Sequence, residues 1–346
     1  METDRLLDET DLALLDALQV SPRASWTKLG EVLGAAPITL ARRWQRLVDT
    51  GAAWISVAGS NARSRGAIVE FVCAPGTEMT VAAELAELPY ASTVGITTGD
   101  YHVYANIVAS TLAATTEILL HGLPLSPHVM RTRSHVFGSL FGGMVWRLGV
   151  MNRSQTQQIR EVLDPPQREV HPLGAPDRAL FLALGRDGRR TYTDLAEELG
   201  TTPKAVQRRL NRLERNGDIA FRCDVARALA GWHTMALLWL TVPDAELRTV
   251  GNRMAGWAET RMCAAVASPT NLAAILNLRS FEHLEEILIR IATSLPGVTV
   301  TERRLVLRQV KIYGRLVDED GRSIGVIPPD PWADPQGCYA RPPSRA

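Results

Sequence analysis

Cationic side chains gather on two short segments of the 346-residue chain and are its best candidates for chemistry. The segments are 35 to 51 (AAPITLARRWQRLVDTG) and 201 to 217 (TTPKAVQRRLNRLERNG). Arginine can make paired hydrogen bonds to guanine edges and phosphates, and glutamine suits adenine. The candidate DNA contacts are Thr39, Arg42, Arg43 and Arg46 in the first segment and Thr202, Lys204, Gln207, Arg208, Arg209 and Arg212 in the second.

A helix would place these residues on one face. Leu40, Trp44 and Leu47 recur at i, i+4 and i+7, as do Val206, Leu210 and Leu213, so each set forms a buried stripe with the arginines around the opposite side. A cationic face can also be merely solvated. The near absence of acids between 36 and 48, and the recurrence of the same arginines in both segments, favour contact with DNA.

The two segments belong to an internal repeat with a constant offset of 166 residues. This offset also aligns DLALLDAL (11 to 18) with DRALFLAL (177 to 184) and SWTKLGEVLG (25 to 34) with TYTDLAEELG (191 to 200). Each copy predicts three short helices, with Ser25 or Thr191 capping the second and proline opening the third. The apolar residues that follow each third helix predict a strand, which we interpret as a wing.

A strand-helix-strand-strand-helix-strand order follows each set of helices and predicts a ferredoxin-like βαββαβ module. The expected elements are 67–73, 80–88, 92–97, 101–108, 111–121 and 129–137 in the first copy, and 233–242, 244–259, 262–267, 272–278, 280–294 and 298–309 in the second. The fold class is therefore α+β. Whether the modules pair within one chain or between chains stays open.

The predicted domains are two helix-turn-helix units, 1–60 and 176–228, and two modules, 64–150 and 231–317. Residues 151–175 are expected to form a linker, because they are polar and rich in proline. Residues 318–346 contain few apolar side chains and are expected to be a disordered tail in which Trp332 could dock.

Composition limits the remaining function classes. The chain is 46% hydrophobic and 22% charged, which is typical of a soluble globular protein. It has no apolar run long enough for a membrane span and no basic, apolar leader at METDRLLDETD, so we expect a cytoplasmic protein. The four cysteines are scattered, which argues against a zinc site and a disulfide scaffold. We therefore expect neither a metal nor a cofactor.

The helix-turn-helix string LG, Ser/Thr, Pro, arginines and RL, followed by a βαββαβ module, resembles the Lrp/AsnC family of bacterial transcriptional regulators. The string occurs twice, so the chain resembles two fused subunits. The resemblance implies double-stranded DNA as partner, an oligomer, and an amino-acid-like effector bound near the loop between the second and third strands of the module. In the first copy that loop is Thr98, Gly99, Asp100 and Tyr101, where Asp100 could hold an amino group or the sequence could simply make a hairpin turn. The second copy has Ser268-Pro269-Thr270-Asn271 there, without glycine or carboxylate.

One enzyme class shares this build. Siroheme decarboxylases resemble it in combining helix-turn-helix units with βαββαβ modules, and His102 and His135 could flank a tetrapyrrole. The sequence contains no nucleophile elbow, phosphate loop or HExxH motif. A regulator is therefore the favoured interpretation, and the enzyme is the alternative.

Overall fold

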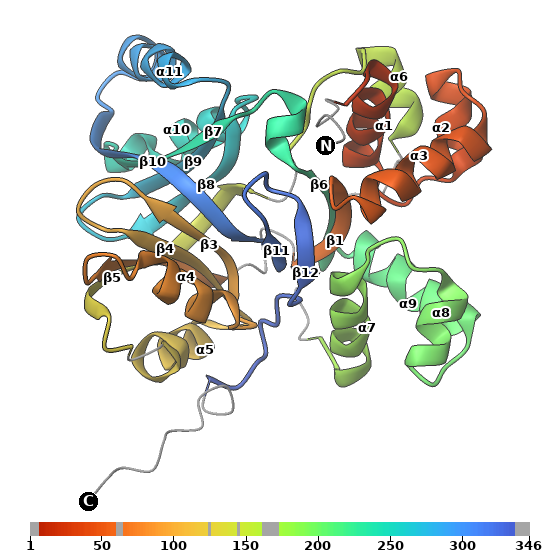
Figure 1. The fold of residues 1–346 in the computed structure, drawn as a ribbon, viewed down its shortest axis with the longest axis horizontal. Helices are drawn as coiled ribbons and strands as arrows, with labels where there is room; N and C mark the ends of the chain where they lie inside the picture. The colour runs from red at the N-terminus through yellow and green to blue at the C-terminus, as the bar shows by residue number, and fades with distance from the viewer. Residues whose placement is uncertain (1–6, 60–64, 124–125, 144–145, 161–172, 336–346) are drawn as a thin grey trace, which may run out of the picture.

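The computed structural model describes residues 7–59, 65–123, 126–143, 146–160 and 173–335. Two helix-turn-helix units lie on one side of the molecule and a barrel of strands lies on the other (Figure 1). Within the described ranges, no helix is long and apolar enough to cross a membrane.

Each repeat begins with the three predicted helices. They are α1 (Glu9–Val20), α2 (Trp26–Leu33) and α3 (Pro37–Asp49) in the first repeat and α7 (Ala175–Arg186), α8 (Tyr192–Glu198) and α9 (Pro203–Arg215) in the second. Ser25 and Thr191 cap α2 and α8 through their hydroxyls, as predicted. Thr202 caps α9, whereas Ala36 gives α3 no side-chain cap. The sequence thus predicts the helices, and the structure shows that α3 has the weaker start.

The strand after each third helix forms, but the prediction of a wing was wrong. β1 (Ala53–Gly59) and β6 (Ile219–Val225) pair antiparallel with each other, from Ala53 opposite Val225 to Gly59 opposite Ile219. Each strand therefore satisfies backbone groups of the other repeat instead of folding back on its own unit. One apolar cluster runs through both units and this two-stranded ribbon, so the two units share a core.

A reciprocal exchange of arginines also joins the two units. Arg23 donates to the carbonyls of Gly188 and Arg190, and Arg189 donates to those of Pro22 at 2.7 Å and Ala24 at 3.0 Å. Donors and acceptors are matched residues of the repeat, 166 positions apart. The contact is thus made twice about a pseudo-twofold axis.

The two βαββαβ modules have the predicted element order, which confirms the fold class. The first contains β2 (Arg65–Cys73), α4 (Glu78–Ala86), β3 (Ala91–Thr97), β4 (Val103–Ala109), α5 (Leu112–Glu117) and β5 (Val129–Gly142), and the second contains β7 (Thr234–Thr241), α10 (Leu247–Ala255), β8 (Thr260–Ala267), β9 (Leu272–Leu278), α11 (Phe281–Ser294) and β10 (Thr299–Ile312). A π-helical turn, Ile118–Gly122, continues α5.

The modules pair with each other within the chain and close a barrel. The strand order is β10-β3-β4-β2-β5-β8-β9-β7, and β7 returns to β10. α4 and α5 cover one flank of the barrel, and α10 and α11 cover the opposite flank (Figure 1). A separate apolar cluster underlies the helices of each module, and a further cluster fills the barrel interior. All eight strands have neighbours on both sides, so the barrel has no free edge.

The predicted linker and the predicted tail both contain ordered parts. In the linker, α6 (Arg153–Ile159) begins at a capping box made by Asn152 and Gln155, and Ile159 joins the helix-turn-helix core. A short amphipathic segment can fold here because an apolar surface lies beside it. Residues 161–172 of the linker lie outside the described part of the chain.

The tail is likewise ordered as far as residue 335. β12 (Ser323–Val326) pairs with β11 (Arg315–Val317), which pairs with β10. Trp332 packs edge-on against Phe181 at 5.3 Å between ring centroids, so it does dock. The few apolar side chains of this segment suffice because they bind to surfaces that the rest of the chain provides. Residues 336–346 of the predicted tail are not described.

Candidate DNA interface and barrel charge network

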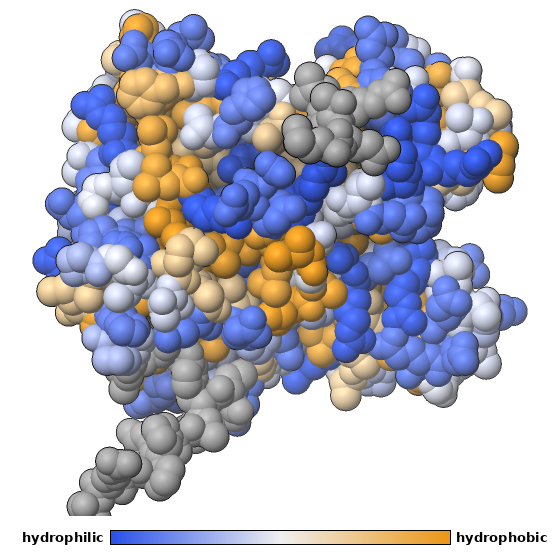
Figure 2. All heavy atoms as spheres, viewed as in Figure 1, coloured by the Kyte–Doolittle hydropathy of each residue, from blue (hydrophilic) through white to orange (hydrophobic). Residues whose placement is uncertain are grey.

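The predicted DNA contacts lie on the outer face of α3 and α9. Leu40, Trp44 and Leu47 are buried beneath α3, and Val206, Leu210 and Leu213 beneath α9, as the periodicity predicts. Thr39, Arg42, Arg46, Thr202, Lys204, Gln207, Arg208 and Arg212 are exposed, while Arg43 and Arg209 are half-buried. Hydrophilic residues cover most of the visible surface of both helix-turn-helix lobes (Figure 2).

Four of the predicted arginines are held by an acid on the first helix of their own unit. Asp11 pairs with Arg43 at 2.9 Å and Arg46 at 2.6 Å. Its repeat partner Asp177 pairs with Arg212 at 2.6 Å and Arg209 at 3.3 Å. These ion pairs fix the third helix against the first. A phosphate bound at this face would have to compete with these two acids for the same guanidinium groups.

The remaining cations on the outer faces of α3 and α9 do not pair with an acid of the first helix. Within the described residues, Arg42, Lys204 and Arg208 form no ion pair, and Gln207 forms no side-chain hydrogen bond. Asn211 and Arg215, which sequence reasoning missed, line a hollow on α9 together with Lys204 and Arg208. Their helical spacing from Arg208, at i+3 and i+7, was the available signal.

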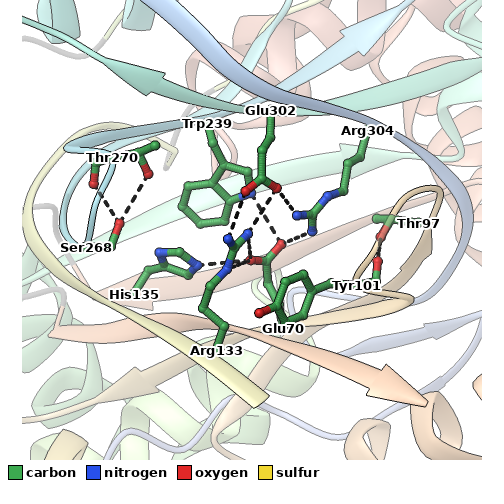
Figure 3. A network of polar contacts seen from close by, with 10 residues as sticks. All are labelled: Glu70, Thr97, Tyr101, Arg133, His135, Trp239, Ser268, Thr270, Glu302 and Arg304. Carbon is green, nitrogen blue, oxygen red and sulfur yellow. Dashed lines mark hydrogen bonds and ion pairs between the residues drawn. The ribbon is translucent and has the colours of Figure 1, made fainter. Parts of the chain in front are cut away.

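A charge network occupies one end of the barrel interior. In the pairing of β2 with β5, Glu70 lies opposite Arg133, and in the pairing of β7 with β10, Trp239 lies opposite Glu302. Glu70 and Trp239 are 169 residues apart, as are Arg133 and Glu302. The network is therefore built from matched positions of the two modules, whose side chains meet in its centre (Figure 3).

Glu70 is the centre of this network and is fully buried. It accepts hydrogen bonds from Arg133 Nη2 at 2.7 Å, His135 Nε2 at 3.0 Å, Trp239 Nε1 at 3.3 Å and Arg304. Burial acts to raise the pKa of Glu70, but the hydrogen bond from His135 and the charges of the two arginines outweigh it and hold that pKa below its usual 4.5. Glu70 is therefore a carboxylate at neutral pH.

Glu302 completes the charge balance. It pairs with Arg133 Nη1 at 2.8 Å and with Arg304. Two carboxylates thus face two guanidinium groups in a largely enclosed space. The sequence signal that could have located this network is a charged residue inside an apolar strand, such as Glu70 in AIVEFVC.

The predicted effector loop lies against this network. The ring of Tyr101 is buried among the guanidinium groups of Arg133, at 4.3 Å from its centroid, and Arg304, at 5.1 Å. Thr98 Oγ1 accepts a hydrogen bond from the Leu305 amide at 3.0 Å, and Gly99 has a φ of 91°, which suits glycine. Asp100 is exposed and has no side-chain partner among the described residues. Thr98, Gly99, Asp100 and Tyr101 stay predicted effector residues.

The matching loop of the second module lies on the opposite side of the network (Figure 3). There the Asn271 side chain exchanges hydrogen bonds with the backbone of Val242, at 2.9 Å and 2.7 Å. Its amide is thus fully used in holding the loop.

The two histidines of the enzyme alternative are both engaged. The His135 ring stacks on Trp239 at 3.9 Å between centroids, in addition to its bond to Glu70. His102 Nδ1 accepts a hydrogen bond from the Cys73 amide at 3.1 Å. Both side chains therefore have structural partners.

This architecture defines a helix-turn-helix protein whose two paired ferredoxin-like modules are part of one chain. The AsnC-type helix-turn-helix domain matches residues 7–48 and again 175–214, and the Lrp/AsnC ligand-binding domain matches residues 235–316. The chain belongs to the Lrp/AsnC family, with its helix-turn-helix domain duplicated.

Individual relatives match less than half of the chain. An uncharacterized HTH-type transcriptional regulator from Pyrococcus abyssi is 26% identical over 139 residues, which are 40% of this chain and 87% of the relative. The leucine-responsive regulatory protein of Rhizobium meliloti is 26% identical over 143 residues, 40% of this chain and 92% of the relative. Each relative thus corresponds to about one of the two repeats.

A solved structure matches nearly the whole chain. The siroheme decarboxylase NirDL superposes with a TM-score of 0.55 at 15% identity and covers 91% of this chain and 96% of its own. The likeness shows that both halves of the present chain share the NirDL fold.

Proposed function

We propose that the protein is a sequence-specific DNA-binding transcriptional regulator of the Lrp/AsnC type that acts in the cytoplasm. The observation that carries this proposal is the presence, on both matched helices, of outward cations that no acid neutralises. Arg42 on α3 and Arg208 on α9 are matched residues, and both are exposed and unpaired within the described chain. A helix with such a face fits the major groove and can contact phosphates and base edges.

The shared core supports simultaneous use of both units. The β1–β6 ribbon and the arginine exchange set their separation within one chain. The outer faces differ, because Ile38 and Ala41 on α3 correspond to Lys204 and Gln207 on α9. We therefore expect an imperfect palindrome as the preferred site, with α9 making the larger share of contacts.

An amino-acid-like effector is the second part of the proposal. It is supported by the ligand-binding domain match over residues 235–316 and by the position of Thr98 to Tyr101 beside the junction of the modules. Such a ligand regulates DNA binding only if it binds two arrangements of the protein with different affinities.

The decisive experiment captures genomic fragments with the purified protein, sequences them, and titrates the best fragment by fluorescence anisotropy. A combined Arg42→Ala and Arg208→Ala variant should bind about 10- to 100-fold more weakly while its thermal unfolding is unchanged. The matched control, Arg46→Ala with Arg212→Ala, should lose less affinity, because Asp11 and Asp177 already hold those arginines.

The salt dependence of binding is a second measurement. If about six phosphates are contacted, log K should fall with a slope near −5 against log salt. Normal binding by the first variant would show that the interface lies elsewhere.

A siroheme decarboxylase is the alternative, and the full-length likeness to NirDL is the observation that favours it. His135 Nε2 and His102 Nδ1 make structural hydrogen bonds that need no enzyme to explain them, while His135 Nδ1 is buried without a partner. Incubation of the purified protein with siroheme, followed by absorbance and mass spectrometry, separates the two. A bound chromophore that loses carboxyl groups would replace the regulator proposal.

A further inference from the structure

A second site lies in the barrel, at the end remote from the charge network. Alternate residues of a strand face the same side, so the inward positions of β2 are Glu70, Ile68 and Gly66. Glu70 belongs to the network, Ile68 belongs to the apolar cluster, and a cavity of about 110 Å³ lies beyond. Arg222 and Asp224 of β6 line this cavity, so it opens between the barrel and the helix-turn-helix pair.

Four of the residues that line the cavity carry a buried polar side-chain atom without a partner. These atoms are the side-chain oxygens of Asn106, Asn277 and Gln309 and the Nε of Arg227. Asn277 is 2% exposed and Gln309 is 5% exposed, so bulk water does not satisfy them. Gln309 Nε2 donates to Tyr104 Oη at 2.7 Å, which leaves the amide oxygen of Gln309 as the free acceptor. Buried polar groups of this kind are usually paired, so their clustering around one cavity needs an explanation.

The charges around the cavity are unbalanced. Asp224 accepts hydrogen bonds from Arg222, at 2.7 Å and 3.0 Å, and also pairs with Arg261. Arg227 makes no ion pair among the described residues, and burial lowers its pKa to about 10, a value at which it stays cationic at neutral pH. The cavity therefore offers uncompensated positive charge beside acceptors that lack donors.

We propose that this cavity binds a small carboxylate that also carries hydroxyl or amino donors, with Arg227 holding the carboxylate and Asn277 and Gln309 accepting from the donors. The volume suits roughly five to seven non-hydrogen atoms, given that a cavity of about 150 Å³ admits benzene. The site is separate from the effector loop at Thr98 to Tyr101 and does not depend on the proposed DNA binding.

Isothermal titration calorimetry of the full chain without DNA tests this site. Glycerate supplies a carboxylate with hydroxyl donors, and alanine supplies a carboxylate with an amino donor. Propionate lacks the donors and glycerol lacks the carboxylate. Glycerate or alanine should bind saturably at one site per chain, at least about tenfold more tightly than propionate and glycerol. Equal binding of all four, or no saturable binding of glycerate and alanine, overturns the proposal.

Two variants locate the binding. Arg227→Met should weaken the better probe at least about tenfold, whereas Arg303→Met, which removes an exposed arginine of the same barrel, should leave its affinity unchanged. Asn277→Leu removes an unpartnered oxygen at nearly constant volume, so it should raise the melting temperature of the unliganded protein and weaken the probe. Unchanged probe affinity in both cavity variants would place the binding elsewhere and overturn the assignment. DNA binding of the same variants is a separate readout, so failure here leaves the regulator proposal intact.

Discussion

In the helix-turn-helix pair, the matched positions that hold the units together carry the same residues and make the same contact twice. Asp11 and Asp177 each hold two arginines of the third helix, and Arg23 and Arg189 exchange hydrogen bonds across the axis. In the barrel, matched positions carry different residues that complement each other. Glu70 meets Trp239, and Arg133 meets Glu302.

A second barrel junction differs in the same way. Lys311 of β10 is fully buried and donates to the carbonyls of Ala86 at 2.8 Å and Leu88 at 2.9 Å, at the end of α4. The position of β5 that lies 169 residues earlier is Gly142, where an added Cβ would come within 3.0 Å of Ala255, the residue that matches Ala86. The long side chain of Lys311 thus fills the first junction, and at the second junction the backbone at Gly142 approaches Ala255 closely.

The difference between the helix-turn-helix pair and the barrel shows what the fusion of two repeats into one chain permits. In a homodimer the residues on the axis meet their own copies, so a buried Glu70 would face a second Glu70 and like charges would repel. Fusion of the repeats lets the two sides change independently. The barrel resembles a heterodimer within one chain, whereas the helix-turn-helix pair keeps the symmetry that the proposed binding to two DNA half-sites requires.

Removal of the central carboxylate should have the largest effect. Glu70→Gln leaves Arg133 and Arg304 without their main buried partner, and we expect the free energy of unfolding to fall by about 3–5 kcal/mol in urea titrations. Glu285→Gln, an exposed change on α11, is the control and should cost less than about 0.5 kcal/mol. Similar losses for the two variants would mean that the network does not stabilise the barrel.

Lys311 should make stability depend on alkaline pH. Burial lowers its pKa to about 7, against 10.5 when unfolded, and the charge of Glu87 opposes this only in part. The folded state then binds fewer protons between pH 7 and 10.5, so the free energy of unfolding rises with pH across that window, by up to about 5 kcal/mol. Lys311→Met should remove this rise, because methionine does not titrate. An identical slope in both proteins would contradict the assignment to Lys311.

Removal of either arginine that joins the two units, Arg23 or Arg189, should lower the free energy of unfolding by nearly the same amount. Arg23→Ala and Arg189→Ala each remove hydrogen bonds to two carbonyls of the other unit, and each should cost about 1–3 kcal/mol by chemical denaturation. The double variant should cost less than the sum if the two contacts support each other. Single losses that differ by more than about 2 kcal/mol would show that the pair is symmetric in geometry and not in energy.

Asp177→Asn should have the smallest effect on stability, under about 1 kcal/mol, because Arg209 and Arg212 are partly exposed. Anisotropy titrations should show DNA binding tightened by roughly two- to tenfold at low salt, since both arginines become available to phosphates. Asp320→Asn removes the same charge from an exposed turn and is the control for net charge. Equal tightening in both variants would mean that the freed arginines do not reach DNA.

Local pattern was enough to predict the elements and much of the candidate interface. The amphipathic periodicity of α9 correctly predicted that Leu210 is buried and Arg208 is exposed, because these outcomes depend on residues within one or two helical turns. The pairing of Arg212 with Asp177 was not predicted, since it requires knowing how two helices of one unit cross.

The sequence by itself determined the repeat, the helix-turn-helix units, the βαββαβ order and the cationic faces of α3 and α9. Tertiary structure alone decided that β1 pairs with β6, that the modules close one barrel, and that Arg304 reaches Glu70 across 234 residues of chain. The physical reason is the distance along the chain over which each kind of interaction acts. Periodicity and capping are set by neighbours in sequence, whereas strand partners and buried ion pairs are set by which surfaces of the folded repeats bury the most apolar area and satisfy the most polar groups together.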